Sequence, residues 1–360
     1  MILKKAFFLL CIPFSFIYFF IVSMRNIFYR LGIFRKYKIN AKVISVGNIT
    51  WGGTGKTPVV AFIADLVSRK NRRVGILIRG YGNDESELLP KLTDGSGGFQ
   101  TRHPEEPFDG VYPERSRGAQ GELRDEGSHN IPVLVGKDRV KTGIEAIENH
   151  LSDTLILDDG FQYRRLRRDL DIVCLDATEP FGNGWVIPAG SLREGLGSLK
   201  RADVFLITKA DLVSDKNKLE KLEKKLKSIN PGALIAKAIH RPLYFYRLIN
   251  EEKVNIGELQ NKKLVLVSAI GSPECFEKTI LRLGLKINKH FIFRDHHLYT
   301  KNDVAQIEDY CKKNQLDTMV ITEKDAVKLK GQKYLALKVR LEIIENEDGF
   351  YNRLFGIYNS

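Results

Sequence analysis

A glycine-rich stretch with a lysine and a threonine is the part of this sequence whose residue types most directly imply chemistry. The run WGGTGKT covers residues 51–57. Glycines in such a loop let backbone N–H groups converge on phosphate oxygens. A lysine at position 56 can reach the β- and γ-phosphates, and a threonine at position 57 can bind Mg²⁺. We therefore predict a loop that binds the phosphates of a nucleotide, made of Thr50, Trp51, Gly52, Gly53, Thr54, Gly55, Lys56 and Thr57.

This loop departs from the strict phosphate-loop pattern at one position. The pattern G-x-x-x-x-G-K-[ST] requires glycine at position 50, where the chain has Thr50. The context nevertheless fits, because AKVISVG is typical of a buried strand and TPVVAFIADLVSRK of the helix that follows the loop. A glycine-rich turn with an incidental lysine is the alternative interpretation.

Two adjacent carboxylates follow another apolar run. Asp158 and Asp159 come directly after TLIL, at the predicted end of a strand. Because carboxylate oxygens suit a hard cation, we predict that they bind Mg²⁺ together with Thr57. The alternative is that one caps a turn and the other is solvated. Further on, PAGSLRE places Arg193 where it could bind a phosphate and Glu194 where it could assist the metal.

The stretch ITKAD, residues 207–211, indicates a different possibility. It has the Thr-Lys-x-Asp form with which many GTPases bind guanine. A membrane-anchored GTPase is therefore an alternative function. Such proteins also carry an Asp-x-x-Gly element between the phosphate loop and this motif. Here the sequence at residues 158–160 is Asp-Asp-Gly, which is one residue too short.

Short apolar runs alternate with helical segments through most of the chain, a pattern typical of a parallel sheet buried on both faces. We predict an α/β protein with a mostly parallel sheet of the P-loop NTPase type and helices on both faces. A smaller α/β domain should follow, preceded by two extended runs that read as a hairpin linker. The predicted divisions are 1–38 (membrane anchor and interfacial helix), 39–233 (phosphate-loop domain), 234–260 (hairpin linker) and 261–360 (second domain with tail).

The N-terminal segment is apolar enough to enter a membrane. Ala6 to Ser23 carries no charge and would span about 27 Å as a helix. Basic residues predominate after it, which places the following domain in the cytoplasm. A cleaved signal peptide is the rival interpretation, but no small-x-small cleavage site follows Ser23. The next residues, up to Lys38, space apolar side chains as an interfacial helix would, or as a core-facing helix would.

The charge balance and the cysteines restrict the class of protein further. The formal net charge is +13, with a pI of about 9.4. This excess suits a nucleic acid, an anionic membrane or a phosphorylated substrate, although a generally basic surface explains it equally well. The four cysteines form no CxxC pair, which argues against a zinc site or a disulfide framework and favours a reducing compartment.

Taken together, the motifs resemble the tetraacyldisaccharide 4'-kinase family. The resemblance rests on RNIFYR, ISVGNITWGGTGKTPVV, IRGYG, PVLVGKDRV, LDDGFQYRRLRRDLDIVCLD, PAGSLREGL, RADVFLITKAD, DHHLY and ITEKDAVKL, in that order. It implies transfer of the γ-phosphate of ATP, with Mg²⁺, to the 4'-hydroxyl of a lipid A disaccharide precursor. It also implies a place at the inner membrane, among anionic lipids, with the catalytic domains on the cytoplasmic face. Neither a nucleic acid nor an obligate protein partner is expected.

The resemblance also assigns catalytic residues, with one departure. Lys56 and Arg193 match the family's motifs, and His296 matches a histidine that works with an aspartate across the domain cleft. That aspartate belongs to a Gly-Asp-Glu-Pro motif, which this chain lacks. Residues 97–130, rich in Gly, Pro, Arg and Glu, stand in its place and predict a disordered or loosely packed loop. We take Asp125 as the partner of His296, with Glu126 and Asp109 as the other candidates.

Overall fold

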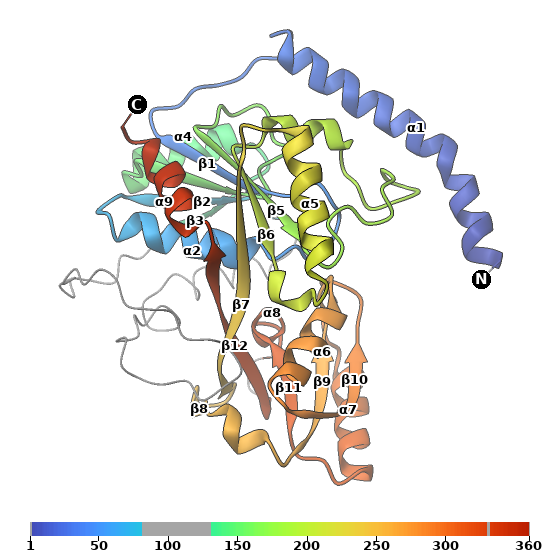
Figure 1. The fold of residues 1–360 in the computed structure, drawn as a ribbon. Helices are drawn as coiled ribbons and strands as arrows, with labels where there is room; N and C mark the ends of the chain where they lie inside the picture. Colours follow the sequence, from blue (N-terminus) through green and yellow to red (C-terminus); the bar gives the residue numbers. More distant parts are fainter. Residues whose placement is uncertain (1, 81–130, 330–331, 360) are drawn as a thin grey trace.

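The computed structural model describes residues 2–80, 131–329 and 332–359, with side chains from residue 8 onward. Strands and helices alternate over most of this length (Figure 1). The strands are β1 (Lys42–Gly47), β2 (Val74–Ile78), β3 (Val133–Val135), β4 (Thr154–Asp158), β5 (Leu170–Asp176), β6 (Val204–Thr208), β7 (Leu234–Arg247), β8 (Lys253–Val254), β9 (Lys263–Ser268), β10 (Lys286–Ile292), β11 (Met319–Thr322) and β12 (Tyr334–Glu345).

The helices are distributed along the whole chain. The α-helices are α1 (Ile2–Arg30), α2 (Lys56–Ser68), α4 (Arg139–His150), α5 (Lys216–Ile229), α6 (Pro273–Arg282), α7 (Lys301–Lys313), α8 (Glu323–Ala326) and α9 (Glu347–Gly356). Short 3-10 helices cover η1 (Leu196–Arg201), η2 (Ala210–Leu212) and η3 (Ile256–Leu259). The predicted loop 97–130 lies outside the described residues.

The described strands form one sheet in the order β10-β9-β11-β12-β7-β6-β5-β1-β4-β2-β3, with β8 paired to β7. Pairing is parallel from β7 to β3 and again from β10 to β12. Only the pairs β7/β12 and β7/β8 are antiparallel among these strands. The predicted α/β fold with a mostly parallel sheet is therefore confirmed.

Helices cover both faces of the larger half of the sheet, as its fully apolar strands require. On one face, Val59 and Ile63 of α2 pack in a cluster with Phe350 of α9. On the other face, Leu222 and Leu226 of α5 pack against the sheet. Burial on both faces explains why β1, β4, β5 and β6 are near-continuous runs of apolar residues.

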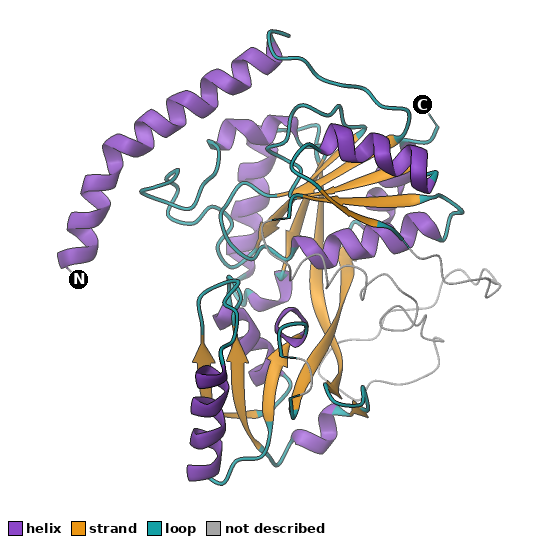
Figure 2. Ribbon diagram, turned by 180° about the vertical axis from the view of Figure 1, so that it is seen from behind, coloured by secondary structure: helices purple, strands orange, loops and turns teal. Residues whose placement is uncertain are grey.

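Two long strands connect the halves of the molecule (Figure 2). β7 and β12 pair along most of their length, with His240 opposite Leu341. The region predicted as a hairpin linker does contain the short antiparallel pair β7/β8, but the longer partner of β7 is β12. Because β12 carries the chain back across the molecule, α9 packs in the core of the first half. The C-terminal end therefore departs from the predicted division, which assigned all of 261–360 to the second domain.

Parallel pairing brings the ends of several strands to one edge of the sheet. Val46, near the end of β1, pairs with Asp158 at the end of β4. Asp176 at the end of β5 pairs with Thr208 at the end of β6. Ligands of open α/β sheets bind at this edge, outside the carboxyl ends of the strands. The glycine-rich loop that follows β1 thus lies beside all three neighbouring strand ends.

The N-terminal helix α1 runs unbroken from Ile2 to Arg30, through Pro13. Of the segment predicted as an interfacial or core-facing helix, the part up to Arg30 is helical and continues α1, and residues 31–38 follow as a loop. From Phe8 to Arg30 the helix is long and apolar enough to cross a membrane, judged by length and composition. Between Phe8 and Arg30, most of the apolar side chains are exposed, Leu10 and Phe20 among them.

Candidate active site

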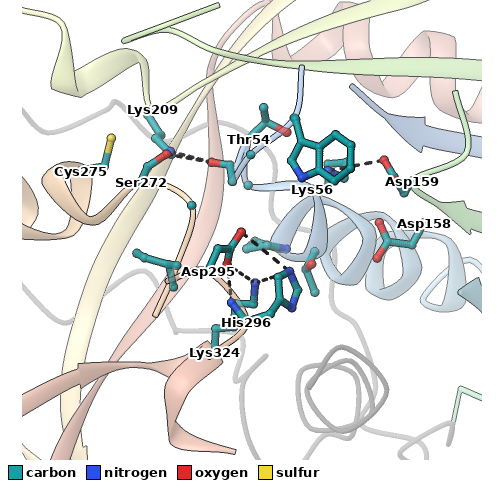
Figure 3. Close-up of a pocket in the computed structure, with 18 of the residues that line it drawn as sticks. Thr54, Lys56, Asp158, Asp159, Lys209, Ser272, Cys275, Asp295, His296 and Lys324 are labelled. Carbon is teal, nitrogen blue, oxygen red and sulfur yellow. Dashed lines mark hydrogen bonds and ion pairs between the residues drawn. The ribbon is translucent and has the colours of Figure 1, made fainter. Parts of the chain in front are cut away.

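A pocket of about 1040 Å³ separates the two halves of the molecule, and residues of both line it (Figure 3). The first half contributes the glycine-rich loop, Asp158 and Asp159. The second half contributes the loops after β9 and β10, which carry Ser272 and His296. Both sets of loops follow the carboxyl ends of parallel strands, so two such edges face each other across the pocket. The predicted residues brought together here are Trp51, Gly52, Gly53, Thr54, Gly55, Lys56, Thr57, Asp158, Asp159, Arg193 and His296.

The glycine-rich loop has a backbone that its glycines make possible. Gly52 and Gly55 have φ values of 130° and 75°, a region that side chains disfavour. Gly55 is the N-cap of α2, and Lys56 and Thr57 open that helix. The first N–H groups of a helix lack internal partners and attract anions. The loop therefore aims backbone donors, an ammonium and a hydroxyl into the pocket.

Neighbouring strands fix the shape of this loop. Thr208 Oγ1, at the end of β6, donates a 2.9 Å hydrogen bond to the carbonyl oxygen of Thr54. Asn48 Nδ2 donates to Thr54 Oγ1 at 3.0 Å. Lys209 Nζ donates to the carbonyl oxygen of Gly53 at 2.9 Å and forms an ion pair with Asp176. These contacts from the neighbouring strand ends fix the loop without a bound ligand.

The first two residues of the predicted loop join it to the segment that carries Arg193. Thr50 is buried and forms an isolated β-bridge with Leu192. Thr50 is not among the residues that line the pocket. Trp51 is 67% exposed, and its backbone N–H donates to the carbonyl oxygen of Ser191 at 2.6 Å. The Arg193 guanidinium lies over the Trp51 ring, 5.7 Å from its centroid. Trp51 is thus placed to support the arginine.

Asp159 is the centre of a group of charges. Arg193 NH1 lies 2.5 Å from one carboxylate oxygen, and Lys56 Nζ lies 3.6 Å from the other. Burial raises the pKa of Asp159, but Lys56 and Arg193 outweigh it and hold that pKa at about 2. The buried Arg139, which the sequence analysis did not single out, donates to the Asp159 carbonyl oxygen at 3.2 Å. Arg139 belongs to the KDRV stretch after β3, which is part of the PVLVGKDRV motif that resembles the family.

Glu194 lies apart from this group, although it follows Arg193 directly. Its carboxylate is buried and ion-paired to Arg25 at 3.0 Å and to Arg201 at 2.9 Å. Asn26 Nδ2 also donates to it at 3.1 Å. Arg25 and Asn26 belong to α1, so Glu194 ties the N-terminal helix to the body of the molecule. The predicted role of Glu194 as a metal ligand beside Asp158 and Asp159 stays a prediction, and its carboxylate already has two arginine partners in the described part of the chain.

The second half contributes a cluster around His296. The Lys324 ammonium contacts Asp295 Oδ1 at 3.0 Å and His296 Nε2 at 3.1 Å, and Asp295 Oδ2 lies 3.8 Å from that nitrogen. His296 has a φ of 62°, so the loop is tightly turned there. Its neighbour His297 instead contacts Asp303, in the first turn of α7, at 2.9 Å. Asp295 and Lys324 were not predicted as site residues.

Asp125, the predicted partner of His296, lies outside the described residues, as do Glu126 and Asp109. Within the described chain, Asp295 is the carboxylate recorded beside the His296 ring. The DHH sequence placed both residues in one loop but gave no signal that their side chains approach each other.

A second histidine lies beside the glycine-rich loop. A Cβ atom added at Gly55 would lie 2.6 Å from Cε1 of His240, so the glycine leaves room for the imidazole. The Nε2 atom of His240 is buried without a hydrogen-bond partner in the described part of the chain. Burial, and secondarily the nearby Lys209, lowers the pKa of His240 to about 4. The ring is therefore neutral near pH 7.

These features define a class: a two-part α/β protein with a phosphate loop that opens into a cleft shared by both parts. Comparisons with known proteins identify the family. The family model for tetraacyldisaccharide-1-P 4'-kinase, LpxK, matches residues 7–110 and 111–357. The chain belongs to this family and is a kinase. This assignment gives no support to the GTPase alternative.

Relatives with the same name cover most of the chain. The tetraacyldisaccharide 4'-kinase of Bdellovibrio bacteriovorus is 38% identical over 325 residues, 88% of each protein. That of Syntrophus aciditrophicus is 36% identical over 341 residues, 93% of this chain and 87% of the relative. Among solved structures, LpxK of Aquifex aeolicus in complex with ATP matches with a TM-score of 0.66 and 25% identity, covering 99% of both chains.

Proposed function

We propose that this kinase transfers the γ-phosphoryl group of ATP to the 4'-hydroxyl of a tetraacyldisaccharide 1-phosphate at a membrane surface. The observation that carries the proposal is the charge cluster of Lys56, Asp159 and Arg193, which faces His296 across one pocket. Phosphoryl transfer depends mainly on positioning and charge neutralisation, and this cluster supplies both. The family's name and the ATP complex of the Aquifex protein support the choice of acceptor and donor.

The residues at this edge of the sheet also fit Mg²⁺. Thr57, Asp158 and Asp159 offer a hydroxyl and two carboxylates, the hard oxygen donors that this ion prefers. The low pKa of Asp159 keeps its carboxylate ionised at neutral pH. Bound there, the ion would neutralise charge on the phosphates of the nucleotide. Glu194 is not proposed as a ligand, since two arginines already hold its carboxylate.

The remaining side chains take roles that follow from their positions. Lys56 stabilises negative charge on the β- and γ-phosphates, and Arg193 does so from the other side of Asp159. His296 accepts the proton of the attacking hydroxyl, or orients that hydroxyl. Asp295 holds the His296 loop, since its Oδ1 accepts a hydrogen bond from the His296 N–H at 3.1 Å. Asp125 stays a predicted partner of His296 from the family resemblance.

The acceptor reaches the pocket from the membrane side. Tyr18, Arg25 and Tyr29 of α1 line the same pocket as Lys56. A helix with exposed apolar side chains on most of its length fits an acyl-chain environment better than water. The basic residues that follow α1 suit anionic headgroups, each contributing about 1 kcal/mol near the surface. We place the body of the protein on the cytoplasmic face of the inner membrane.

A labelling experiment tests the proposal. Purified full-length protein in detergent is incubated with ATP carrying ³²P in the γ position, Mg²⁺ and the tetraacyldisaccharide 1-phosphate. We expect label in the lipid fraction, lost on chelation of Mg²⁺ and reduced at least 100-fold in Lys56→Ala. Label released only as inorganic phosphate, at the same rate with and without the lipid, would refute the proposed acceptor.

A further inference from the structure

The TEKD stretch at the end of β11 places three charged side chains in a row at the pocket. It consists of Thr322, the last residue of β11, and of Glu323, Lys324 and Asp325, which open the four-residue helix α8. Glu323 and Lys324 line the pocket, whereas Asp325 is fully buried. The three charged side chains have different partners, so each can hold a separate segment around the pocket.

Glu323 and Asp325 anchor α8 on two sides. The Glu323 carboxylate pairs with Lys338 of β12 at 2.8 Å and accepts a hydrogen bond from the Val339 N–H at 3.1 Å. Both oxygens of Asp325 accept from the Ala269 N–H at 3.2 Å, in the loop after β9. Buried carboxylates are stable only with such donors around them, so these contacts fix the short helix between β12 and β9.

Ala269 carries this constraint to the loop of His296. Its N–H donates to Asp325, and its carbonyl oxygen accepts a hydrogen bond from the His296 N–H at 3.4 Å. The same N–H also donates to Asp295 Oδ1 at 3.1 Å. Two acceptors therefore fix the left-handed backbone at His296, where φ is 62°.

Lys324 acts on the ring of His296 itself. Its ammonium donates to Asp295 Oδ1 at 3.0 Å and to His296 Nε2 at 3.1 Å (Figure 3). Because an ammonium has donors only, the Nε2 atom that it meets carries the lone pair, and a neutral imidazole then has its proton on Nδ1. The hydrogen bond at one ring nitrogen thus decides which nitrogen is protonated.

We propose that Lys324 is a positioning residue for phosphoryl transfer, which holds the His296 ring in the tautomer whose Nε2 atom can accept a proton. The inference rests on the proposed function, in which His296 meets the attacking hydroxyl. A ring with its proton on Nε2 could only donate to that hydroxyl, and could not take the hydroxyl proton through this nitrogen.

The arriving hydroxyl replaces the ammonium at Nε2, while the ammonium stays bound to Asp295. The hydroxyl oxygen then forms a bond to the γ-phosphorus as the bond from that phosphorus to the bridging oxygen breaks, which releases ADP. The O–H bond breaks in the same step, and its proton passes to Nε2 of His296. The imidazolium that forms lies beside the Asp295 carboxylate, whose Oδ2 is 3.8 Å from Nε2.

Nitrogen NMR of the histidine rings tests the tautomer directly. Full-length protein in detergent at pH 8 is labelled with ¹⁵N in the rings of its seven histidines, and the His296 signals are assigned by their loss in His296→Gln. Lys324→Met removes the ammonium and keeps an unbranched side chain. Lys313→Met, at an exposed position in the last turn of α7, removes the same charge and is the matched control. Neither ATP nor lipid is added.

We expect Nε2 of His296 in the wild type to have the chemical shift of an unprotonated ring nitrogen, and Nδ1 that of a protonated one. In Lys324→Met the two shifts should approach each other, because the ring then exchanges between its tautomers. Lys313→Met should match the wild type. A proton on Nε2 in the wild type, or the same tautomer in Lys324→Met as in the wild type, would overturn the inference.

Rates of lipid phosphorylation test whether the tautomer matters for transfer. Lys324→Met should lower kcat about 10-fold, which is part of the roughly 10²–10⁴-fold that a general base supplies, and should leave the KM for ATP within twofold of wild type. In a His296→Ala background the same substitution should cause no further loss. An equal loss in both backgrounds would overturn the inference, since Lys324 would then act without His296. Because the NMR samples contain no substrate, the expected tautomer without any lipid phosphorylation would count against the proposed function alone.

Discussion

The guanidinium of Arg193 and the carboxylate of Asp159 lie 2.5 Å apart, although the two residues are 34 positions apart in the chain. The contact joins the loop after β4 to the segment before η1, and Lys56 approaches the other oxygen of the same carboxylate. Three charged side chains from three separate motifs thus form one unit at the mouth of the phosphate loop. Each of them has a defined place relative to the others before a nucleotide binds.

Replacing Asp159 with asparagine tests the unit. We expect Asp159→Asn to lower the transfer rate at least 100-fold and to raise the Mg²⁺ concentration needed for half-maximal rate, because a carboxylate is lost from the donor set and Arg193 loses its ionic partner. Asp309→Asn, on the exposed side of α7, is the control. An unchanged Mg²⁺ titration in Asp159→Asn would remove Asp159 from the metal site.

The loop that carries His296 yields a second prediction. His296→Ala should reduce the rate by about 10²-fold or more, the usual range for losing a general base. Asp295→Asn should reduce it less, because it disturbs the loop and not the accepting nitrogen. If the two residues act as one unit, the double variant should be no slower than His296→Ala. Steady-state rates of the three variants test this. Wild-type turnover in His296→Ala would show that the proton of the hydroxyl leaves by another route.

The half-buried ring of His240 predicts how the stability of the protein depends on pH. Its pKa is about 4 in the folded protein and about 6.5 in an unfolded chain. Because the folded pKa is the lower one, the unfolded state binds the proton more tightly, so stability is complete above pH 6.5 and falls as the pH drops toward 4. His240 alone should lower the free energy of unfolding by about 3 kcal/mol between pH 7 and pH 4.

Urea unfolding of wild type and His240→Gln at pH 7, 5.5 and 4 measures that contribution. The variant carries no titrating ring, so its free energy of unfolding should change less with pH, by about 3 kcal/mol over the whole range. Parallel curves for the two proteins would mean that the imidazole is not held neutral beside Gly55.

The N-terminal helix contacts the active-site segment directly. Ser15 Oγ donates to the Val186 carbonyl oxygen and accepts from the Ala189 N–H, both at 2.9 Å. Tyr18 OH donates to the carbonyl oxygen of Arg193 at 2.9 Å. Because small misplacements of reacting groups are costly, we expect Ser15→Ala/Tyr18→Phe to lower the rate about 10-fold.

Membrane partitioning of the same variant separates positioning from anchoring. The exposed apolar side chains of α1 are untouched, so the fraction that pellets with membranes should stay at the wild-type level. Ser23→Ala, on the same helix, makes neither of these contacts and should change nothing. A variant that loses activity only in proportion to its loss from the membrane fraction would show that α1 serves as an anchor alone.

The fold and much of the site follow from local sequence signals. Fully apolar runs predict strands buried on both faces, and glycines at 52 and 55 permit the backbone that the phosphate loop adopts. Asp158 and Asp159 were predicted from the rule that parallel sheets bind ligands at the carboxyl ends of strands, and both line the pocket. These signals depend on residues close together in the chain, so one sequence is enough to recognise them.

Other features depend on partners far away in the chain, which no local pattern predicts. Glu194 is held by Arg25, 169 residues away, and no local pattern predicts that contact. Ser15 and Tyr18 lie in the uncharged segment predicted to enter a membrane, yet they bond to the loop that carries Arg193. The return of α9 to the first half likewise depends on the path of β12.

The central claim is that the pocket between the two halves brings the γ-phosphate of ATP to one particular hydroxyl of the lipid, to which it is transferred. The most direct measurement is tandem mass spectrometry of the lipid product formed by purified wild-type protein, compared with Lys56→Ala. We predict a gain of one phosphate on the distal glucosamine at the 4' position, dependent on ATP and Mg²⁺ and lacking in the variant. A lipid with unchanged mass, or a phosphate at any other position, would contradict the account.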